Sequence, residues 1–126
     1  MNLETTYVHL RVDRRSTLLP VTETFWRDLD GRRDLDPGQL VMGFSFSADW
    51  PTWEMHPAGD EVVTLLSGEA TLVLQHPEGA QRVQLSTPGD FVVVPRGVWH
   101  TAQTTVPCRM LFVTPGEGTE NRAHPP

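Results

Sequence analysis

Residues 53–61 read Trp-Glu-Met-His-Pro-Ala-Gly-Asp-Glu. Side chains two positions apart on a β-strand point to the same face, so Glu54 and His56 become neighbours on one face of an expected strand. The Pro-Ala-Gly-Asp segment has the composition of a turn that reverses the chain. Glu61 then opens the next strand, where it can lie beside the first two side chains. The stretch therefore predicts a β-rich fold in which three possible metal ligands converge.

The same alternation of short strands and turns continues on both sides of this stretch. From about Leu40 onward, Gly and Pro recur about every ten residues, and the segments between them are rich in β-branched and aromatic residues. The pattern predicts an all-β fold. The expected strands are Leu40 to Ser47, Trp53 to His56, Glu61 to Leu66, Ala70 to His76, Arg82 to Ser86, Phe91 to Val94, Val98 to Thr105 and Arg109 to Thr114.

The two ends of the chain give weaker signals. Tyr7 to Val12 alternates as a strand does, whereas Phe25 to Gly38 has no regular period and is expected to be a loop with at most one helical turn. The tail from Pro115 is rich in Gly, Pro and charge, so we expect it to lie on the surface or fray. We divide the chain into an N-terminal strand and loop extension packing on the barrel (1–39), a barrel (40–114) and a surface tail (115–126).

Four aspartates in the N-terminal loop raise the alternative of a calcium site. They are Asp28, Asp30, Asp34 and Asp36. An EF-hand needs acidic or amide ligands at its first, third and fifth positions, and Arg32 occupies the third position when Asp30 is taken as the first. We therefore interpret this segment as a solvated acidic loop.

The size and charge of the chain limit the classes of function that it can have. A chain of 126 residues fits one domain, and its net charge of -6 would repel the phosphate backbone of a nucleic acid. The single cysteine, Cys108, cannot form an internal disulfide, which favours a reducing compartment. The longest apolar runs are far too short to span a membrane. We expect a cytoplasmic protein with no nucleic-acid or membrane partner.

A fourth candidate ligand, His100, lies far along the sequence. The segment from Gly89 to His100 is another turn and strand, which a closed barrel would bring opposite the first stretch. Three or four nitrogen and oxygen ligands on rigid strands, with positions left open to water or substrate, suit a divalent metal ion.

These positions resemble the two sequence motifs of the cupin superfamily. The matching residues are His56, Glu61 and Gly68 in the first motif and Gly89, Pro95, Gly97 and His100 in the second. The resemblance covers roughly Leu40 to Thr114 and is to small, single-domain, bacterial-type cupins. It implies a small jelly-roll barrel, or double-stranded β-helix, with a metal held by side chains at these positions. It does not imply one reaction.

One departure from the motif affects the chemistry. Glu54 stands where the motif has its first histidine, so the expected ligand set contains two carboxylates. The ligands are Glu54, His56, Glu61 and His100. This set would leave a divalent ion near neutral and favour Mn²⁺ or Fe²⁺, with Ni²⁺ and Zn²⁺ still open. Without metal, Glu54 and Glu61 would be neighbouring carboxylates, one with a raised pKa, and Glu54 is the candidate catalytic acid or base.

Two classes of function remain open at this point. The first is a metal-dependent enzyme that acts on a small organic molecule, as an oxygenase, isomerase or lyase. The second is a non-catalytic module that binds or senses a small molecule or a metal. The ligand positions share strand parity with apolar residues, which suits a small organic ligand with few charges. These residues are Val63, Leu65, Val98 and Ala102.

Residues outside the motifs receive structural interpretations. Trp53 and Trp99 directly precede two candidate ligands, so they face away from the site and, with the N-terminal strand, favour a homodimer. Cys108 is expected to be a small buried hydrophobe. The remaining histidines are expected on the surface or in turns; they are His9, His76 and His124.

Overall fold

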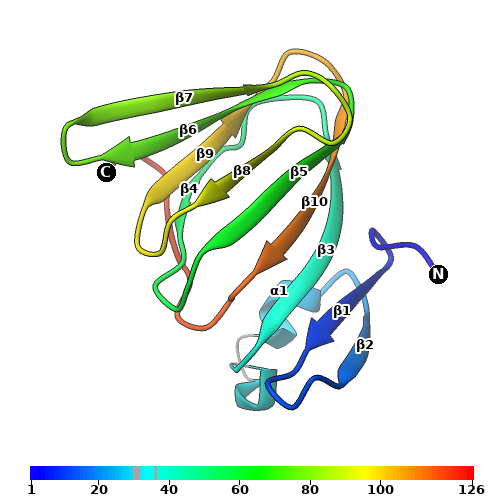
Figure 1. Ribbon diagram of the computed structural model, residues 1–126. Coiled ribbons are helices and arrows are strands. Elements are labelled where there is room, and N and C mark those ends of the chain that lie inside the picture. The colour runs from blue at the N-terminus through cyan, green and yellow to red at the C-terminus, as the bar shows by residue number, and fades with distance from the viewer. Residues whose placement is uncertain (30–31, 36) are drawn as a thin grey trace.

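The computed structural model describes residues 1–29, 32–35 and 37–126, and these form two antiparallel β-sheets that face each other (Figure 1). The strands are β1 (Thr6–Leu10), β2 (Ser16–Pro20), β3 (Gln39–Phe46), β4 (Trp53–Met55), β5 (Glu61–Ser67), β6 (Ala70–His76), β7 (Gly79–Leu85), β8 (Phe91–Val94), β9 (Trp99–Gln103), β10 (Cys108–Thr114) and β11 (Glu120–Arg122). The described part also holds one short helix, α1 (Phe25–Leu29), and a 3-10 turn, η1 (Arg33–Leu35). The prediction of an all-β fold is confirmed.

The order of the strands is that of a jelly roll. One sheet runs β2-β1-β3-β10-β5-β8 and the other runs β11-β4-β9-β6-β7. Strands that are neighbours in space, such as β3 and β10, are far apart in the sequence, because the chain switches between the sheets. One switch occurs at the turn between β4 and β5. Glu54 and Glu61 therefore belong to different sheets and approach each other across the gap between them.

The facing sides of the two sheets bury one apolar core. Alternate residues of β5, β6, β9 and β10 point into it, as the period of a strand requires. Its buried members include Val63, Leu65, Leu72, Leu74, Ala102, Cys108, Met110 and Phe112, with Trp50 and Val98 packed against them. Each large aliphatic side chain buried in this way contributes about 1.5–3 kcal/mol. Cys108 is buried here, as expected.

The N-terminal strands extend the six-stranded sheet, since β1 pairs with β3 through Val8 and Val41. A second apolar cluster forms there under α1, from Tyr7, Leu19, Phe25 and Leu40. Strand β2 was not predicted, because its hairpin turns at Arg14, which has a φ of 71°, without the Gly or Asn that usually signals such a turn. The expectation that His9 is a surface residue is wrong. His9 is buried on β1, with Nε2 2.7 Å from the carbonyl oxygen of Pro37.

The acidic loop carries an ion pair. The Arg32 side chain donates two hydrogen bonds of 2.9 Å to the Asp34 carboxylate, and Asp28 accepts one from Thr24. Asp30 and Asp36, the other members of the calcium alternative, lie outside the described residues. A carboxylate already held by a guanidinium is a poor calcium ligand, which agrees with the interpretation of a solvated loop.

The C-terminal tail holds a strand that the sequence did not predict. β11 lies on the surface and pairs with β4, so that Asn121 is opposite Glu54 and Arg122 is opposite Trp53. The guanidinium carbon of Arg122 lies 4.4 Å from the centre of the Trp99 ring, a cation–π contact. The tail therefore covers Trp99 with a side chain of the same molecule. Among the described residues, no helix is long and apolar enough to cross a membrane.

Candidate metal centre

Three neighbouring segments position the candidate ligands. Glu54 is the central residue of β4 and is paired in register with His100 of β9. His56 directly follows β4, and the carbonyl oxygen of its backbone accepts a hydrogen bond from Gly97, 3.0 Å away. Glu61 is the first residue of β5, in the opposite sheet. The strand pairing on one side and the turn on the other bring the four side chains to one place.

The structure brings together all four residues that the sequence singled out. We call this group the ligand cluster: Glu54, His56, Glu61 and His100. Nε2 of His56 lies 3.6 Å from a carboxylate oxygen of Glu54 and 3.3 Å from Oε2 of Glu61. Nε2 of His100 lies 3.1 Å from Oε1 of Glu61. The ligand atoms of Glu54, His56 and His100 all lie within 4.8 Å of one another, a spacing that suits one metal ion.

The ligand cluster is buried except on one side. The side chain of His100 is 0% exposed and those of Glu61 and His56 are 3% and 5% exposed. The Glu54 side chain, in contrast, is 32% exposed. A molecule from solvent therefore meets Glu54 before it meets the other three side chains.

Each histidine uses its Nδ1 atom to contact the surrounding protein. Nδ1 of His100 lies 3.2 Å from the backbone oxygen of Val98, which can only accept, so Nδ1 of His100 carries the proton. Nδ1 of His56 lies 2.8 Å from the hydroxyl of Thr119. In their neutral forms, a proton on Nδ1 leaves Nε2 with a free lone pair, which is the form that binds metals.

The atoms at the centre of the ligand cluster lack hydrogen-bond partners. They are Nε2 of His56, Nε2 of His100 and Oε1 of Glu61, all buried. Lone pairs of two imidazoles and a carboxylate that face one another repel unless a proton or a cation lies among them. Two donors about 2.1 Å from one ion lie about 3.0–3.4 Å apart, close to the separations observed here. The residues present therefore fit a divalent cation.

The charges of the ligand cluster shift the pKa values of its members. Burial raises the pKa of Glu61, but His100 and His56, which in their protonated forms would donate to its carboxylate and add positive charge, outweigh burial and lower it to about 2. Burial lowers the pKa of His100, yet the contact with the Glu61 carboxylate reverses this effect and raises it overall. Burial, followed by the negative charge of Glu61, raises the pKa of Glu54. The two carboxylates thus differ: Glu61 stays ionised while Glu54 holds a proton more readily.

Two threonines at the site were missed by the sequence analysis. The Thr114 hydroxyl donates a hydrogen bond of 2.5 Å to Oε2 of Glu61 and so orients that carboxylate. Thr114 shares the inward parity of the other buried residues of β10, and this signal could have identified it. Thr119, which contacts His56, lies in the tail that we expected on the surface or frayed. No periodic pattern in the tail indicated its position.

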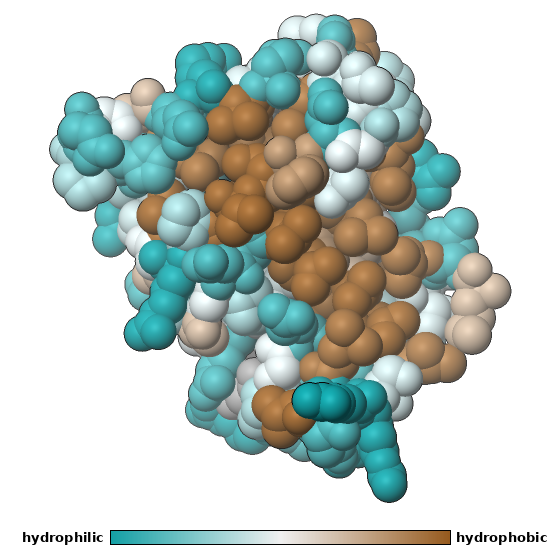
Figure 2. All heavy atoms as spheres, viewed as in Figure 1, coloured by the Kyte–Doolittle hydropathy of each residue, from teal (hydrophilic) through white to brown (hydrophobic). Residues whose placement is uncertain are grey.

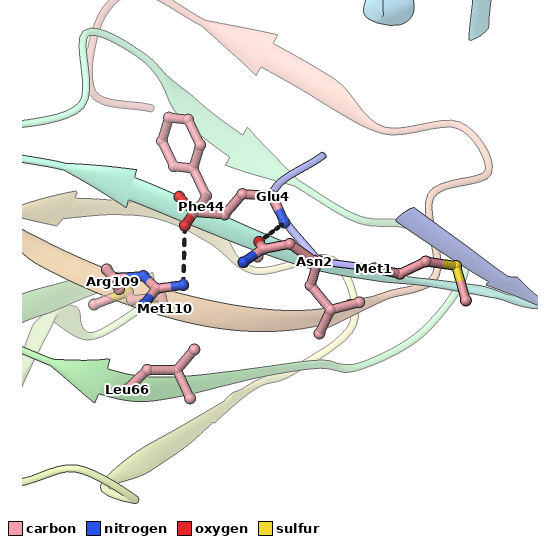
Figure 3. Close-up of a pocket in the computed structure, with 9 residues that line it drawn as sticks. Met1, Asn2, Glu4, Phe44, Leu66, Arg109 and Met110 are labelled. Atoms are coloured by element: carbon pink, nitrogen blue, oxygen red, sulfur yellow. Dashed lines mark hydrogen bonds and ion pairs between the residues drawn. The ribbon is translucent and has the colours of Figure 1, made fainter. Parts of the chain in front are cut away.

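A separate pocket of about 220 Å³ lies elsewhere on the molecule (Figure 3). It is lined by the first four residues and by Gly43, Phe44, Leu66, Arg109 and Met110. Figure 3 shows the Glu4 carboxylate turned toward the guanidinium of Arg109, with which it forms an ion pair of 3.0 Å. The pocket is smaller than typical small-molecule sites, and its Glu4 and Arg109 side chains already pair with each other. It contains none of the ligand cluster.

A family model described as the cupin domain matches residues 34–114, well over half of the chain. The chain belongs to the cupin family. No curated protein sequence matches this cupin. The jelly-roll architecture and the family agree with the sequence resemblance noted above.

Solved structures also match this cupin. A cupin-2 domain protein from Shewanella frigidimarina is 21% identical, with a TM-score of 0.52 over 61% of this chain and 70% of that one. The hydroxypropylphosphonic acid epoxidase from S. wedmorenis in complex with fosfomycin is 21% identical, with a TM-score of 0.53 over 62% and 44%. Hydroquinone 1,2-dioxygenase from Sphingomonas sp. TTNP3 with 4-hydroxybenzoate bound is 17% identical, with a TM-score of 0.51 over 60% and 58%. At these identities the likeness concerns the fold. This cupin spans less than half the length of the epoxidase.

Proposed function

We propose that this cupin binds one divalent metal ion through its ligand cluster and acts as a metal-dependent enzyme on a small organic molecule. The observation that carries the proposal is the orientation of the two histidines. In both side chains, Nδ1 contacts the surrounding protein. Nε2, which has no hydrogen-bond partner, points toward the carboxylate of Glu61. A bound ion would supply Lewis-acid or redox chemistry beside Glu54.

The protein side chains themselves would contribute proton transfer and an environment that excludes water from the ligand cluster. Glu54 is either the fourth ligand or the group that transfers a proton: where it does not coordinate the ion, its raised pKa and partial exposure suit it to hold a proton next to an entering substrate. Glu61 remains ionised and is held by Thr114, which makes it a fixed anionic ligand. Val63 and Ala102 are buried core residues that lie two positions after Glu61 and His100 on the same strands, and they would help to keep bulk water away from the reacting groups.

The donor set influences which metal is preferred. Two carboxylates and two imidazoles favour Mn²⁺ or Fe²⁺ over softer ions, although Zn²⁺ and Ni²⁺ also accept these ligands. Two of the similar structures are an epoxidase and a dioxygenase, which supports an enzyme of the oxygenase type for this cupin, while an isomerase or lyase would use the same ligands. A module that binds or senses a small molecule without turnover is the alternative.

Replacement of His100 by Ala tests the proposal directly. Purified wild-type protein is expected to contain a divalent metal by elemental analysis, or to take up Mn²⁺, Fe²⁺, Ni²⁺ or Zn²⁺ in calorimetry at neutral pH. His100→Ala is expected to lose most of this metal, because a buried imidazole ligand is not replaced well by water. His76→Ala is the matched control, since His76 lies outside the cluster and bonds to Gln81. A wild-type protein that binds none of these ions refutes the metal function.

We also propose that this cupin is a cytoplasmic homodimer. A cytoplasmic location is supported by the single cysteine, Cys108, which is buried as a free thiol and suits a reducing compartment. The support for a dimer is a row of aliphatic residues across the outer side of the six-stranded sheet, one from each strand and each in register with the next. In strand order the row is Leu18, Val8, Val41, Val113, Val62 and Val93.

A further inference from the structure

The C-terminal tail reaches the ligand cluster through a tight turn. The turn spans Gly116 to Thr119, whose backbone nitrogen donates a hydrogen bond of 3.2 Å to the carbonyl oxygen of Gly116. Gly118 has a φ of 73°, and a β-carbon there would lie 3.1 Å from Cγ of Pro57. Only a glycine fits this backbone conformation and this close approach without strain. The turn thus sets the side chain of Thr119 directly beside His56.

The Thr119 hydroxyl has two partners, and together they fix the direction of both hydrogen bonds. Its oxygen lies 2.9 Å from the carbonyl oxygen of Gly116 and 2.8 Å from Nδ1 of His56. A carbonyl oxygen can only accept, so the single hydroxyl proton goes to Gly116. Both contacts are then satisfied in one way: Nδ1 of His56 carries a proton and donates it to the hydroxyl oxygen.

We propose that Thr119 is a positioning residue that holds His56 in the Nδ1-protonated form and so keeps Nε2 free for a metal ion. This inference rests on the proposed metal function. In this respect Thr119 does for His56 what the backbone oxygen of Val98 does for His100. The Thr119 contact comes from a side chain, so a substitution can remove it.

The alternative proton position explains why this contact matters. Either nitrogen of a neutral imidazole can carry the proton. Without Thr119, a proton on Nε2 of His56 would face Oε2 of Glu61, which is 3.3 Å away. A hydrogen bond to this carboxylate would occupy both a ligand nitrogen and a ligand oxygen. The ion would then have to displace that proton before it could bind.

Three substitutions separate this role from simple packing of the tail. Thr119→Val removes the hydroxyl and keeps the shape, while Thr119→Ser keeps the hydroxyl. Arg122→Gln is the control for the tail itself, because it removes the contact with Trp99 without touching His56. A role in packing alone predicts that Thr119→Ser and Arg122→Gln weaken the site at least as much as Thr119→Val.

The test has two readouts. The first is the imidazole ¹⁵N spectrum of the metal-free protein at mildly alkaline pH, where neutral histidines reveal which nitrogen carries the proton. Wild type, Thr119→Ser and Arg122→Gln are expected to show His56 protonated on Nδ1, and Thr119→Val is expected to shift it toward Nε2. The second readout is calorimetry with Zn²⁺ alone, in which Thr119→Val is expected to bind about 10–100-fold more weakly than the other three.

The outcomes distinguish this inference from the metal function. If Thr119→Val retains both the wild-type proton position and the wild-type Zn²⁺ affinity, the role of Thr119 is overturned while the metal function stands. If the wild-type protein itself binds no metal, the metal function is refuted, and the ¹⁵N spectra alone decide whether Thr119 sets the proton position of His56.

Discussion

At the scale of single residues, the Glu54 carboxylate determines the net charge of the ligand cluster. With it, two carboxylates balance a divalent ion, whereas a histidine in its place would leave one positive charge on the ion and its ligands. We predict that Glu54→His keeps metal affinity within about tenfold, because imidazole is itself a competent ligand. Any activity that depends on proton transfer by Glu54 is expected to fall at least about 100-fold.

Paired assays of metal content and turnover check this prediction. Glu54→Gln serves as the matched control. Its side chain has the size of Glu, but it cannot ionise and it does not supply the imidazole ligand of Glu54→His. Full activity in both variants would contradict a role for Glu54 in proton transfer.

The pKa shifts predict how the stability of the metal-free protein depends on pH. His100 and Glu54 have raised pKa values, so the stability that their protonated forms contribute is lost as pH rises above about 6.5 and 4.5, respectively. Glu61 has a pKa lowered to about 2, so its contribution is lost as pH falls below about 4.5. Glu61, Glu54 and His56 are the charged or titratable groups that face His100.

Metal binding should reverse the alkaline part of this profile. The metal-free protein is expected to lose thermal stability as pH rises above about 6.5, whereas the metal-saturated protein is expected to keep it, because the ion replaces the proton in the cluster. Thermal unfolding with chelator and with saturating Mn²⁺ measures the difference in Tm at each pH. A difference that does not grow with pH would argue against an ion among these four side chains.

At the scale of single elements, two glycines with the same φ of 78° allow a controlled comparison of turns. A β-carbon at Gly68 would overlap the carbonyl oxygen of Pro107, whereas a β-carbon at Gly97 meets nothing within 4 Å. We predict that Gly97→Ala costs about 1–2 kcal/mol, the cost of the left-handed conformation alone. Gly68→Ala is expected to cost at least about 3 kcal/mol, because the clash adds to that cost. Urea denaturation of the two variants measures the free energy of unfolding, and equal losses would contradict the clash.

The elements also differ in how far the sequence alone could predict them. Strand parity and the two motifs were enough to predict that these four side chains lie together, because Glu54 and His56 lie two residues apart and a jelly roll brings His100 opposite. The pairing of the strands was not predictable at the same level: β4 and β5 follow each other, but they belong to different sheets. Strand β11 has only three residues, all exposed, so it shows no alternation. The position of Thr119 depends on that strand and on the turn before it, and it remained hidden for the same reason.

At the scale of the whole molecule, the outer side of the six-stranded sheet is unusually apolar. Figure 2 shows hydrophobic residues gathered into a continuous patch on the face that β8, β5, β10, β3 and β1 turn toward the viewer in Figure 1. Leu18 is 49% exposed and Phe91 is 62% exposed, so this surface is open in a single chain. Monomeric proteins rarely leave such a patch in water, and a second copy with the same patch would cover it.

We therefore predict a homodimer through this sheet, which contains the N-terminal strand that the sequence analysis favoured as β1, and not through Trp53 and Trp99. Light scattering is expected to give about twice 14.1 kDa. Val93→Lys is expected to shift the protein toward a monomer, because it puts a charge into this apolar row at its β8 end. Arg82→Glu, on exposed β7 of the opposite sheet, is the matched control and should stay dimeric. A wild-type monomer at micromolar concentration would contradict the prediction.

The four residues of the ligand cluster come from both sheets, and this affects how the two sheets can separate. Glu61 comes from the six-stranded sheet and the other three side chains come from β4, β9 and their ends, so a bound ion would cross-link the two layers. The two sheets could then separate only if the ion dissociated or one coordination bond broke. Amide hydrogen exchange is therefore expected to slow in both sheets at once when metal is added, in strands as distant from the cluster as β7 and β3. An ion held by one sheet alone would protect only the strands beside it.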